Sequence, residues 1–467
     1  MNKIQKPSIL VILLCSLFLT RLTGCGIYGK YQPVQDLDST LYGDLPLSDT
    51  AACLANLDWR ELFTDPCLQA LIDTALRNNH DLRIAHEHVL QAEASLRGAQ
   101  LAYLPSVGLA PAGAFSPMAG VSASGTYDLV ANASWEIDIF GRTLNSLRRA
   151  KAAKAQMLDY EQAARCGLIA GVANTYYTLL MLDAQLEVAE QTEETWEQTV
   201  YAIRRMKDAG MANEAGAAQL EATYYSIQTT VLDFRQQIRE VENAMCLLLG
   251  STHRDIPRTT LDAQSLPDQL EVGIPVQMLY NRPDVRAAQQ NMAQAFYAAN
   301  LARSNCLPSL SLSGTLGWTN HDYVQIFNAP QMISSLAASL FVPLFNSGRN
   351  IAEVRMAKSQ QEEAALLFTK TVLAAGNEVN EALTSYQTCL AKCDLYDRQV
   401  EALTRAQRAT SLMMQYGSTT YLEVLTAQNT LLNAQFTRIS NRMSLLQSAV
   451  SLYHALGGGR DLSQQTQ

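Results

Sequence analysis

The chain alternates between two hydrophobic rhythms, one of seven residues and one of two. Before residue 104, apolar residues recur at steps of three and four, which is the heptad pattern of left-handed coiled-coil packing. The heptad positions are Leu82, Ala85, Val89, Ala92, Leu96, Ala99 and Tyr103. Because three of the seven are alanine, the pattern predicts closely packed helices joined along narrow seams.

Two stretches predict very long helices. Residues 143–209 contain no proline and only two glycines, and residues 349–416 follow the same plan. Such a helix would be about 100 Å long at 1.5 Å of rise per residue. A pattern of this length is typical of a coiled coil, a membrane span or a helical repeat. Glu193, Glu197, Arg204 and Lys207 exclude the membrane span.

After Pro105, and again after Pro308, the period falls to two. In the second case Leu310, Leu312, Leu316 and Trp318 alternate with serine, threonine and glycine, as in a transmembrane barrel strand. A soluble hairpin half-buried on a core is the alternative, but the neighbouring helices carry seams of their own and leave no segment to cover the apolar side.

Two hairpins supply only four strands, and the smallest membrane barrels have about eight. A bilayer does not tolerate open sheet edges, so the membrane interpretation requires further copies of the chain. Two copies would provide eight strands, and three would provide twelve with room for a lumen.

The pattern occurs twice. A shift of 207 residues places Gly141-Arg142 on Gly348-Arg349 and Gly210 on Gly417. The expected organisation is a signal peptide at 1–24, a lipid-anchored strap at 25–56, a first repeat at 57–250 (hairpin about 105–140, long helix about 143–209, return helix about 213–249), a linker at 251–275, a second repeat at 276–457 (hairpin about 308–345, long helix about 349–416, return helix about 420–456) and a tail at 458–467.

The N-terminus has the pattern of a secretory signal that ends in a cysteine. Lys3 and Lys6 precede an apolar run at 9–19, which is too short to span a bilayer. Leu22-Thr23-Gly24-Cys25 resembles the bacterial lipobox, whose cysteine is acylated before cleavage leaves it as the first residue. A plain signal with a chance cysteine is the alternative. Two or three acyl chains on Cys25 would anchor the protein to a membrane, and Gly26 carries no inner-membrane retention signal.

The net charge and the cysteines bear on the partners and bound groups that the chain can have. Removing residues 1–24 removes three basic residues and no acid, which takes the formal charge from −9 to −12 and argues against a nucleic-acid partner. Cys53 and Cys67 flank a short segment and are the candidate disulfide pair in an oxidising periplasm. Cys389 and Cys393 lie one helical turn apart without histidine or acid partners, so no metal site is expected there.

An enzyme finds little support in the sequence. Gly24-x-Gly26-x-x-Gly29 matches a dinucleotide fingerprint by count, but it straddles the cleavage site and follows no strand. We expect no catalytic residues, metal or cofactor.

Several short motifs occur in a fixed order within the duplicated frame. They are Leu22-Thr23-Gly24-Cys25, Leu104-Pro105-Ser106, residues 134–142 (SWEIDIFGR), residues 307–312 (LPSLSL), residues 342–345 (VPLF) with Gly348-Arg349, and Tyr416-Gly417 followed by residues 421–428 (YLEVLTAQ). Together they resemble the TolC-like outer-membrane factors, in particular the lipoprotein branch that serves efflux pumps of the resistance-nodulation-division type.

The resemblance implies an α plus membrane-β fold. Three copies would form a homotrimer whose twelve-stranded β-barrel in the outer membrane continues as a twelve-helix α-barrel in the periplasm. Such a channel would be a passive exit duct for drugs or other small molecules, opened at its periplasmic tip by a periplasmic adaptor docked to an inner-membrane pump. A duct for type I secretion or copper export, and a non-conducting lipid-anchored coiled-coil spacer, are the alternatives.

The resemblance also implies which residues lie at the tip. Members close it with acidic side chains just beyond the glycine turn, and Glu423 matches the first such acid; a solvated surface acid is the alternative. Thr426 stands where a second acid is frequent, and Gly216 where the first-half acid lies, with Glu214 two residues earlier. Glu423 and Glu214 are therefore the gate candidates. The candidate adaptor contacts are Gly210, Met211, Ala212, Gly417, Ser418 and Thr419, whose glycines would also cap helices.

Overall fold

The computed structural model describes residues 28–33, 58–116, 124–210, 213–265, 280–320, 332–416 and 419–460. The chain divides into two compact units. One unit contains Ala92–Lys154 and Gln289–Ala365 with the N-terminal residues to Gln35, and the other contains the remaining residues. The first unit carries the strands and the adjoining helix ends, and the second carries the rest of the helices.

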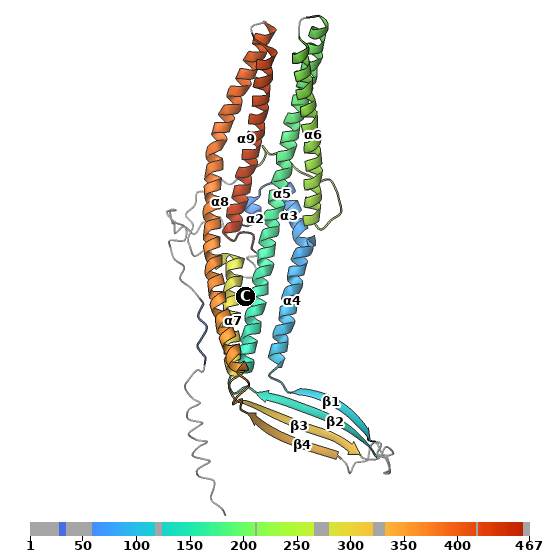
Figure 1. Ribbon diagram of the computed structural model, residues 1–467, viewed down its shortest axis with the longest axis vertical. Helices are drawn as coiled ribbons and strands as arrows, with labels where there is room; N and C mark the ends of the chain where they lie inside the picture. The colour runs from blue at the N-terminus through green and yellow to red at the C-terminus, as the bar shows by residue number, and fades with distance from the viewer. Residues whose placement is uncertain are drawn as a thin grey trace, which may run out of the picture. The chain divides into compact units, whose positions relative to one another are not determined.

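The two halves of the chain repeat the same elements (Figure 1). The first half has α2 (Trp59–Leu62), α3 (Pro66–Asn78), α4 (His80–Leu101), β1 (Ser106–Ser116), β2 (Ser124–Ile137), α5 (Arg142–Asp208) and α6 (Glu214–Leu248). The second half has α7 (Pro283–Ser304), β3 (Ser309–Asn320), β4 (Met332–Phe341), α8 (Arg349–Gln415) and α9 (Tyr421–Ala455). None of the described helices has an apolar stretch long enough to cross a bilayer.

Equal helix lengths show the duplication directly. The long helices α5 and α8 have 67 residues each, the return helices α6 and α9 have 35 each, and α4 and α7 have 22 each. In the long helices, tyrosines and leucines of α5, such as Tyr176 and Leu179, are fully buried. Burial along such a seam stabilises a helix of this length far more than its intrinsic propensity does.

The heptad seam predicted before the first hairpin is the buried side of α4. Within His80–Leu101, only six residues are less than exposed, and Val89 is the one that is fully buried. The six are Leu82, Ala85, Val89, Ala92, Leu96 and Ala99. The strict repeat therefore identified the packing face of this helix residue by residue.

A buried carboxylate ties three distant segments of the second unit together. Asp65 caps α3 by accepting a hydrogen bond from the Cys67 backbone N–H at 2.8 Å. Its other oxygen accepts from the Tyr176 hydroxyl at 2.6 Å, from Thr259 Oγ1 at 2.5 Å and from Gln264 Nε2 at 2.7 Å. The linker after α6 is thus fastened to α3 and to the middle of α5.

Candidate functional site

The four strands form one antiparallel sheet in the order β1-β2-β3-β4. Each half contributes one hairpin, and β2 pairs with β3 to join the halves. This central pairing places Leu129 opposite Trp318 and Trp135 opposite Leu312. Directly paired residues share a face of the sheet, and successive residues of a strand point to opposite faces. The register therefore decides which residues gather on each side.

The observed register collects most of the apolar residues of the four strands on one face, while Val130, Ile333 and Phe341 lie on the other. The members with described side chains are Val107, Leu109 and Pro111 of β1, Leu129, Ala131, Ala133, Trp135 and Ile137 of β2, Leu310, Leu312, Leu316 and Trp318 of β3, and Met332, Leu336, Ala338 and Leu340 of β4. We call this set the apolar face. A shift of one residue in any pairing would split it between the two sides.

Much of the apolar face is exposed in the part of the chain that the structure describes. Leu109 is 67% exposed and Leu336 is 86% exposed. The opposite face is mostly small or polar, and serine and threonine pairs cross it, as in the contact of 2.6 Å between the Thr315 and Ser335 hydroxyls. A continuous exposed apolar surface of this kind marks a site of contact with lipid or with another protein.

Both outer strands of the sheet have one unpaired edge. In the described sheet, β1 pairs only with β2, and β4 pairs only with β3. Edge strands leave a row of backbone N–H and C=O groups available to a further strand. The sheet can therefore grow at both sides.

The first helix tip lies where α5 turns into α6 at Gly210, which has a φ of +73°. Two ion pairs join the helices there: Lys207 Nζ lies 2.6 Å from a Glu214 oxygen, and Arg204 Nε lies 2.7 Å from a Glu221 oxygen. The hydrogen bond and charge of Glu214 raise the pKa of Lys207. Glu214, a gate candidate from the sequence, is thus paired with Lys207 of the preceding helix α5.

The second helix tip carries Glu423 in the first turn of α9. Its carboxylate accepts a hydrogen bond from the hydroxyl of Thr419 and is otherwise exposed. Thr426, which stands where a second acid is frequent in the TolC-like family, donates its hydroxyl to the Leu422 carbonyl at 2.8 Å. Glu423 is therefore the acid that this tip presents to solvent in its first helical turn.

A hydrophobic cluster lies next to the first helix tip and includes residues of α9 from the second half of the chain. It contains Trp196, Val200, Ile203, Ala217, Leu220, Ile227 and Leu425, with Met206, Tyr224, Met414 and Tyr421 packed against it. Leu425 and Tyr421 belong to α9, so this cluster connects the return helices α6 and α9.

Gly216 of α6 lies against the Tyr421 side chain of α9. A Cβ atom at Gly216 would stand 2.4 Å from the Tyr421 ring, which leaves no room for a side chain. In the sequence, Gly216 stood where related proteins carry an acid and Tyr421 began the motif at 421–428, but their contact was not predicted. The glycine was the available signal, because a glycine inside a helix commonly marks close approach by a neighbour.

Several residues proposed from the sequence lie outside the described part of the chain. These are Cys25, Cys53, Met211, Ala212, Gly417 and Ser418. Gly210 follows α5 and Thr419 precedes α9, while Glu214 and Glu423 lie in the first turns of α6 and α9; their roles in gating and adaptor contact stay predictions. Cys67 is half-buried and forms no disulfide with any other described cysteine, and its pairing with Cys53 stays a prediction.

Comparison with known proteins identifies the same architecture. Residues 71–251 and 274–458 match the family model described as outer membrane efflux protein. Among curated relatives, the cation efflux system protein CusC of Escherichia coli O6:H1 is 29% identical over 94% of this chain and 96% of its own. The toluene efflux pump outer membrane protein TtgC of Pseudomonas putida is 28% identical over 94% of this chain and 93% of its own.

Solved structures agree with these relatives. CusC superposes with a TM-score of 0.82 at 26% identity, over 93% of this chain and 100% of that one. The open-state outer membrane channel MtrE of Neisseria gonorrhoeae superposes with a TM-score of 0.83 at 26% identity, over 93% of this chain and 98% of that one. The two repeats, the apolar sheet face and these matches lead to one conclusion: the chain belongs to the outer membrane efflux protein family and is an outer-membrane channel component of an efflux system.

Proposed function

We propose that three copies of the chain close a transmembrane pore. The observation that carries the proposal is the register of the sheet, which gathers the apolar face on one side and leaves β1 and β4 unpaired at their outer edges. Because a bilayer does not tolerate open sheet edges, β4 of one copy pairs with β1 of the next until the ring closes. Three copies provide twelve strands and an open lumen, whereas two would provide eight and a filled interior.

We also propose how the helical part works. Each copy contributes four helical columns, and the twelve columns of the trimer form the periplasmic tunnel. The helix tips form the gate of this tunnel. Glu423 and Glu214 are the acids at the gate, and the periplasmic adaptor contacts the tips around Gly210, Met211, Ala212, Gly417, Ser418 and Thr419. The adaptor connects the channel to an inner-membrane pump. Acyl chains on Cys25 add an anchor in the lipid of the outer membrane.

The channel itself performs no chemistry in this proposal and requires no cofactor. Its cargo is small molecules delivered by the pump. Relatives of the chain are named for cations, antibiotics and toluene, which supports a permissive duct with specificity located in the inner-membrane partner.

Conductance and mass of the purified full-length protein test the proposal. We expect a trimer by native mass spectrometry in detergent and discrete ion-conducting steps in planar bilayers after the tips are loosened by Glu423→Ala. A dimeric or monomeric mass would overturn the trimer. A trimer that never conducts would favour the envelope spacer.

Two adjacent residues of β4 test which face meets lipid. Leu336 belongs to the apolar face, and Ala337 lies on the opposite face. Leu336→Asp is expected to prevent stable assembly in membranes, because a charge facing the acyl chains is costly, whereas Ala337→Asp would face the aqueous lumen and assemble normally. Equal effects of both substitutions would contradict the assignment of the faces.

A further inference from the structure

Each long helix carries two exposed basic residues at matching places just beyond the sheet. On α5 they are Arg148 and Lys151, and on α8 they are Arg355 and Lys358. The shift of 207 residues that relates the two repeats places the first pair on the second. All four residues belong to the first unit, which carries the strands. We call them the basic set.

An exposed apolar residue precedes each basic pair on the same side of its helix. Leu144 lies four residues before Arg148 and seven before Lys151, and Ile351 has the same spacing to the second pair. Residues at these spacings share one side of a helix. The order away from the sheet is therefore apolar residue, arginine, lysine. Such an order suits the boundary between the apolar part of a membrane and water, because long basic side chains pack their stems on apolar surface and keep their charge among polar groups.

Two aromatic residues connect the first basic pair to the apolar face. Trp135 belongs to the apolar face near the end of β2, and its indole N–H donates a hydrogen bond to the Tyr103 carbonyl at 2.9 Å. Burial and the charge of Asp138 raise the pKa of Tyr103, whereas the charge of Arg148 lowers it, so Arg148 lies near this tyrosine. Tryptophan and tyrosine concentrate where a membrane protein meets the headgroups. Arg148 thus lies beside an aromatic boundary of the apolar face.

No acid neutralises the basic set within the part of the chain that the structure describes. None of its four members forms an ion pair, although neighbouring bases do: Lys154 lies 3.4 Å from Glu93, and Arg349 lies 3.0 Å from Glu353. Residues 142–157, the first part of α5, contain five lysines and arginines and no acid. The charges of the basic set are therefore available to an anion outside the chain.

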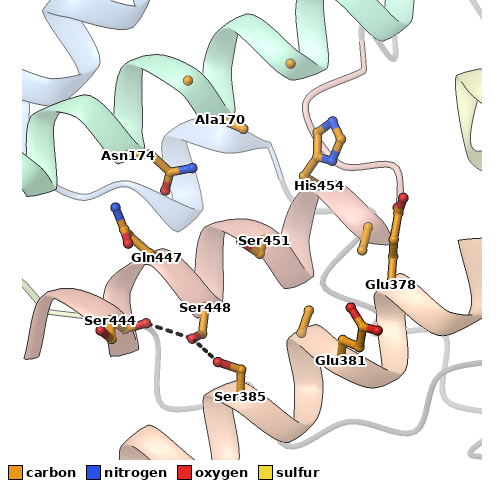
Figure 2. Close-up of a pocket in the computed structure, with 14 residues that line it drawn as sticks. Ala170, Asn174, Glu378, Glu381, Ser385, Ser444, Gln447, Ser448, Ser451 and His454 are labelled. Carbon is orange, nitrogen blue, oxygen red and sulfur yellow. Dashed lines mark hydrogen bonds between the residues drawn. The ribbon is translucent and has the colours of Figure 1, made fainter. Parts of the chain in front are cut away.

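The two units differ in charge. Outside the predicted signal peptide, the first unit contains 11 lysines and arginines and 8 aspartates and glutamates, whereas the second contains 21 and 36. Figure 2 shows one acidic surface of the second unit, a groove between α5, α8 and α9 whose lining residues include Glu378 and Glu381 but no lysine or arginine. An excess of bases confined to the unit with the strands, in an otherwise acidic chain, indicates an anionic partner there.

We propose that the basic set binds the phosphate groups of anionic phospholipids at the periplasmic surface of the outer membrane. The headgroup layer on one side of a bilayer is about 5–8 Å thick. Arg148 and Lys151 lie six and nine residues after the start of α5, about 9 and 14 Å along the helix, and their long side chains can reach back to the headgroups. The inference rests on the proposed pore, which turns the apolar face toward lipid and surrounds the channel with the basic sets of three copies.

Native mass spectrometry of the purified full-length protein, in detergent with equal amounts of phosphatidylglycerol and phosphatidylcholine, tests the proposal. With matched acyl chains, the two lipids differ in the charge of the headgroup. We expect the protein to retain phosphatidylglycerol about fivefold more than phosphatidylcholine, and this preference to fall as salt is raised. The combined variant Arg148→Gln, Lys151→Gln, Arg355→Gln and Lys358→Gln should retain both lipids equally.

A second combined variant is the matched control. Lys370→Gln, Lys392→Gln, Arg405→Gln and Arg408→Gln remove the same charge from exposed positions of α8 in the second unit. This variant should keep the preference for phosphatidylglycerol. An unaltered protein without the preference, or a preference that both variants lose or both keep, would overturn the proposal. So would loss of the trimer in the basic-set variant alone, because the bases would then lie between copies.

Conductance measured on the same preparations separates this inference from the proposed pore. A conducting protein without the lipid preference refutes only the role of the basic set. A protein that never conducts, but whose lipid preference disappears in the basic-set variant, refutes only the channel proposal.

Discussion

The ring of Tyr421 on α9 occupies the space that a side chain at position 216 of α6 would require. A Cβ atom at Gly216 would lie 2.4 Å from this ring, and Tyr421 packs against the cluster that includes Trp196 and Leu425. The two return helices, which belong to different repeats, therefore meet through a glycine and an aromatic ring near the tips. We expect this contact to couple the helix pair α5–α6 to the pair α8–α9, which the proposed gate has to separate.

Gly216→Ala should loosen that contact. The added methyl group displaces the Tyr421 ring, and overpacking of this kind costs about 1–3 kcal/mol. We expect faster hydrogen exchange in the first turns of α6 and α9 and a larger open probability in planar bilayers. In a Tyr421→Ala background the same substitution should be neutral or slightly stabilising, because alanine favours a helix more than glycine does.

Gly98→Ala is the matched control for this experiment. Gly98 is also inside a helix, but a Cβ there would meet no atom within 4 Å. Its replacement should leave hydrogen exchange at the tips unchanged. Additive effects of Gly216→Ala and Tyr421→Ala would show that the two residues are not coupled.

Glu423→Gln should reduce the preference of the open channel for cations. The chain carries a formal charge of −9, which the predicted removal of residues 1–24 would take to −12, and an acid ring at a constriction favours positive ions. We expect the ratio of potassium to chloride permeability, measured from reversal potentials in asymmetric KCl, to fall by about twofold. Glu423→Asp keeps the charge and should keep the ratio. An anion-selective unaltered channel would contradict this prediction.

Asp65→Ala should destabilise the second unit. Burial alone raises the pKa of Asp65, but hydrogen bonds from Thr259, Tyr176 and Gln264 outweigh it and hold the pKa below its ordinary value. Removing the carboxylate leaves these buried donors without a partner and should cost about 3 kcal/mol in the free energy of unfolding.

The control and the acid dependence follow from the same contacts. Asp58 caps α2 on the surface, where its side chain accepts from the Arg60 N–H at 2.9 Å, so Asp58→Ala should cost only about 1 kcal/mol. Because the pKa of Asp65 is lowered in the folded protein, its stabilising effect is present above about pH 4 and is lost as pH falls further. Denaturant melts at pH 7 and pH 3 measure both effects, and equal losses for the two variants would contradict the buried network.

Asp159→Asn should stabilise the protein at alkaline pH. The Asp159 side chain is 2% exposed, and burial raises its pKa to about 6 although Arg286 lies 2.9 Å away. A raised pKa means that the folded protein disfavours the charged form, so stability falls as pH rises from about 4 through 6. The amide removes this cost, which amounts to at most about 3 kcal/mol at pH 8.

The stability difference between Asp159→Asn and the unaltered protein should shrink toward zero at pH 4, where Asp159 is protonated. Asp233→Asn, which replaces an exposed acid of α6, should show no such pH dependence. If Asp159→Asn instead lost stability at pH 8, the ion pair with Arg286 would outweigh the cost of burial.

Cys25→Ala should prevent lipidation. The cysteine is the acceptor in the lipobox resemblance of residues 22–25. Radioactive palmitate should label the unaltered protein and a Cys15→Ala variant, whose cysteine lies in the apolar part of the signal. Continued labelling of Cys25→Ala would refute the lipobox interpretation.

The sequence by itself determined the local structure. The seven-residue period identified the buried side of α4, the absence of proline and the long apolar repeat predicted α5 within one residue of Arg142–Asp208, and the two-residue period marked the strands. Helices and strands impose these periods on neighbouring residues through their own backbone geometry, so the signal lies within each segment.

Only the tertiary structure decided how distant segments meet. The pairing of Leu129 with Trp318, the close approach of Tyr421 to Gly216, and the bonds from Thr259 and Gln264 to Asp65 each join residues more than 180 positions apart. No period within a segment records such contacts, because they depend on register and on side-chain packing between elements. The joining of the four strands into one apolar face and the contact between the helix tips therefore became visible only once the chain was folded.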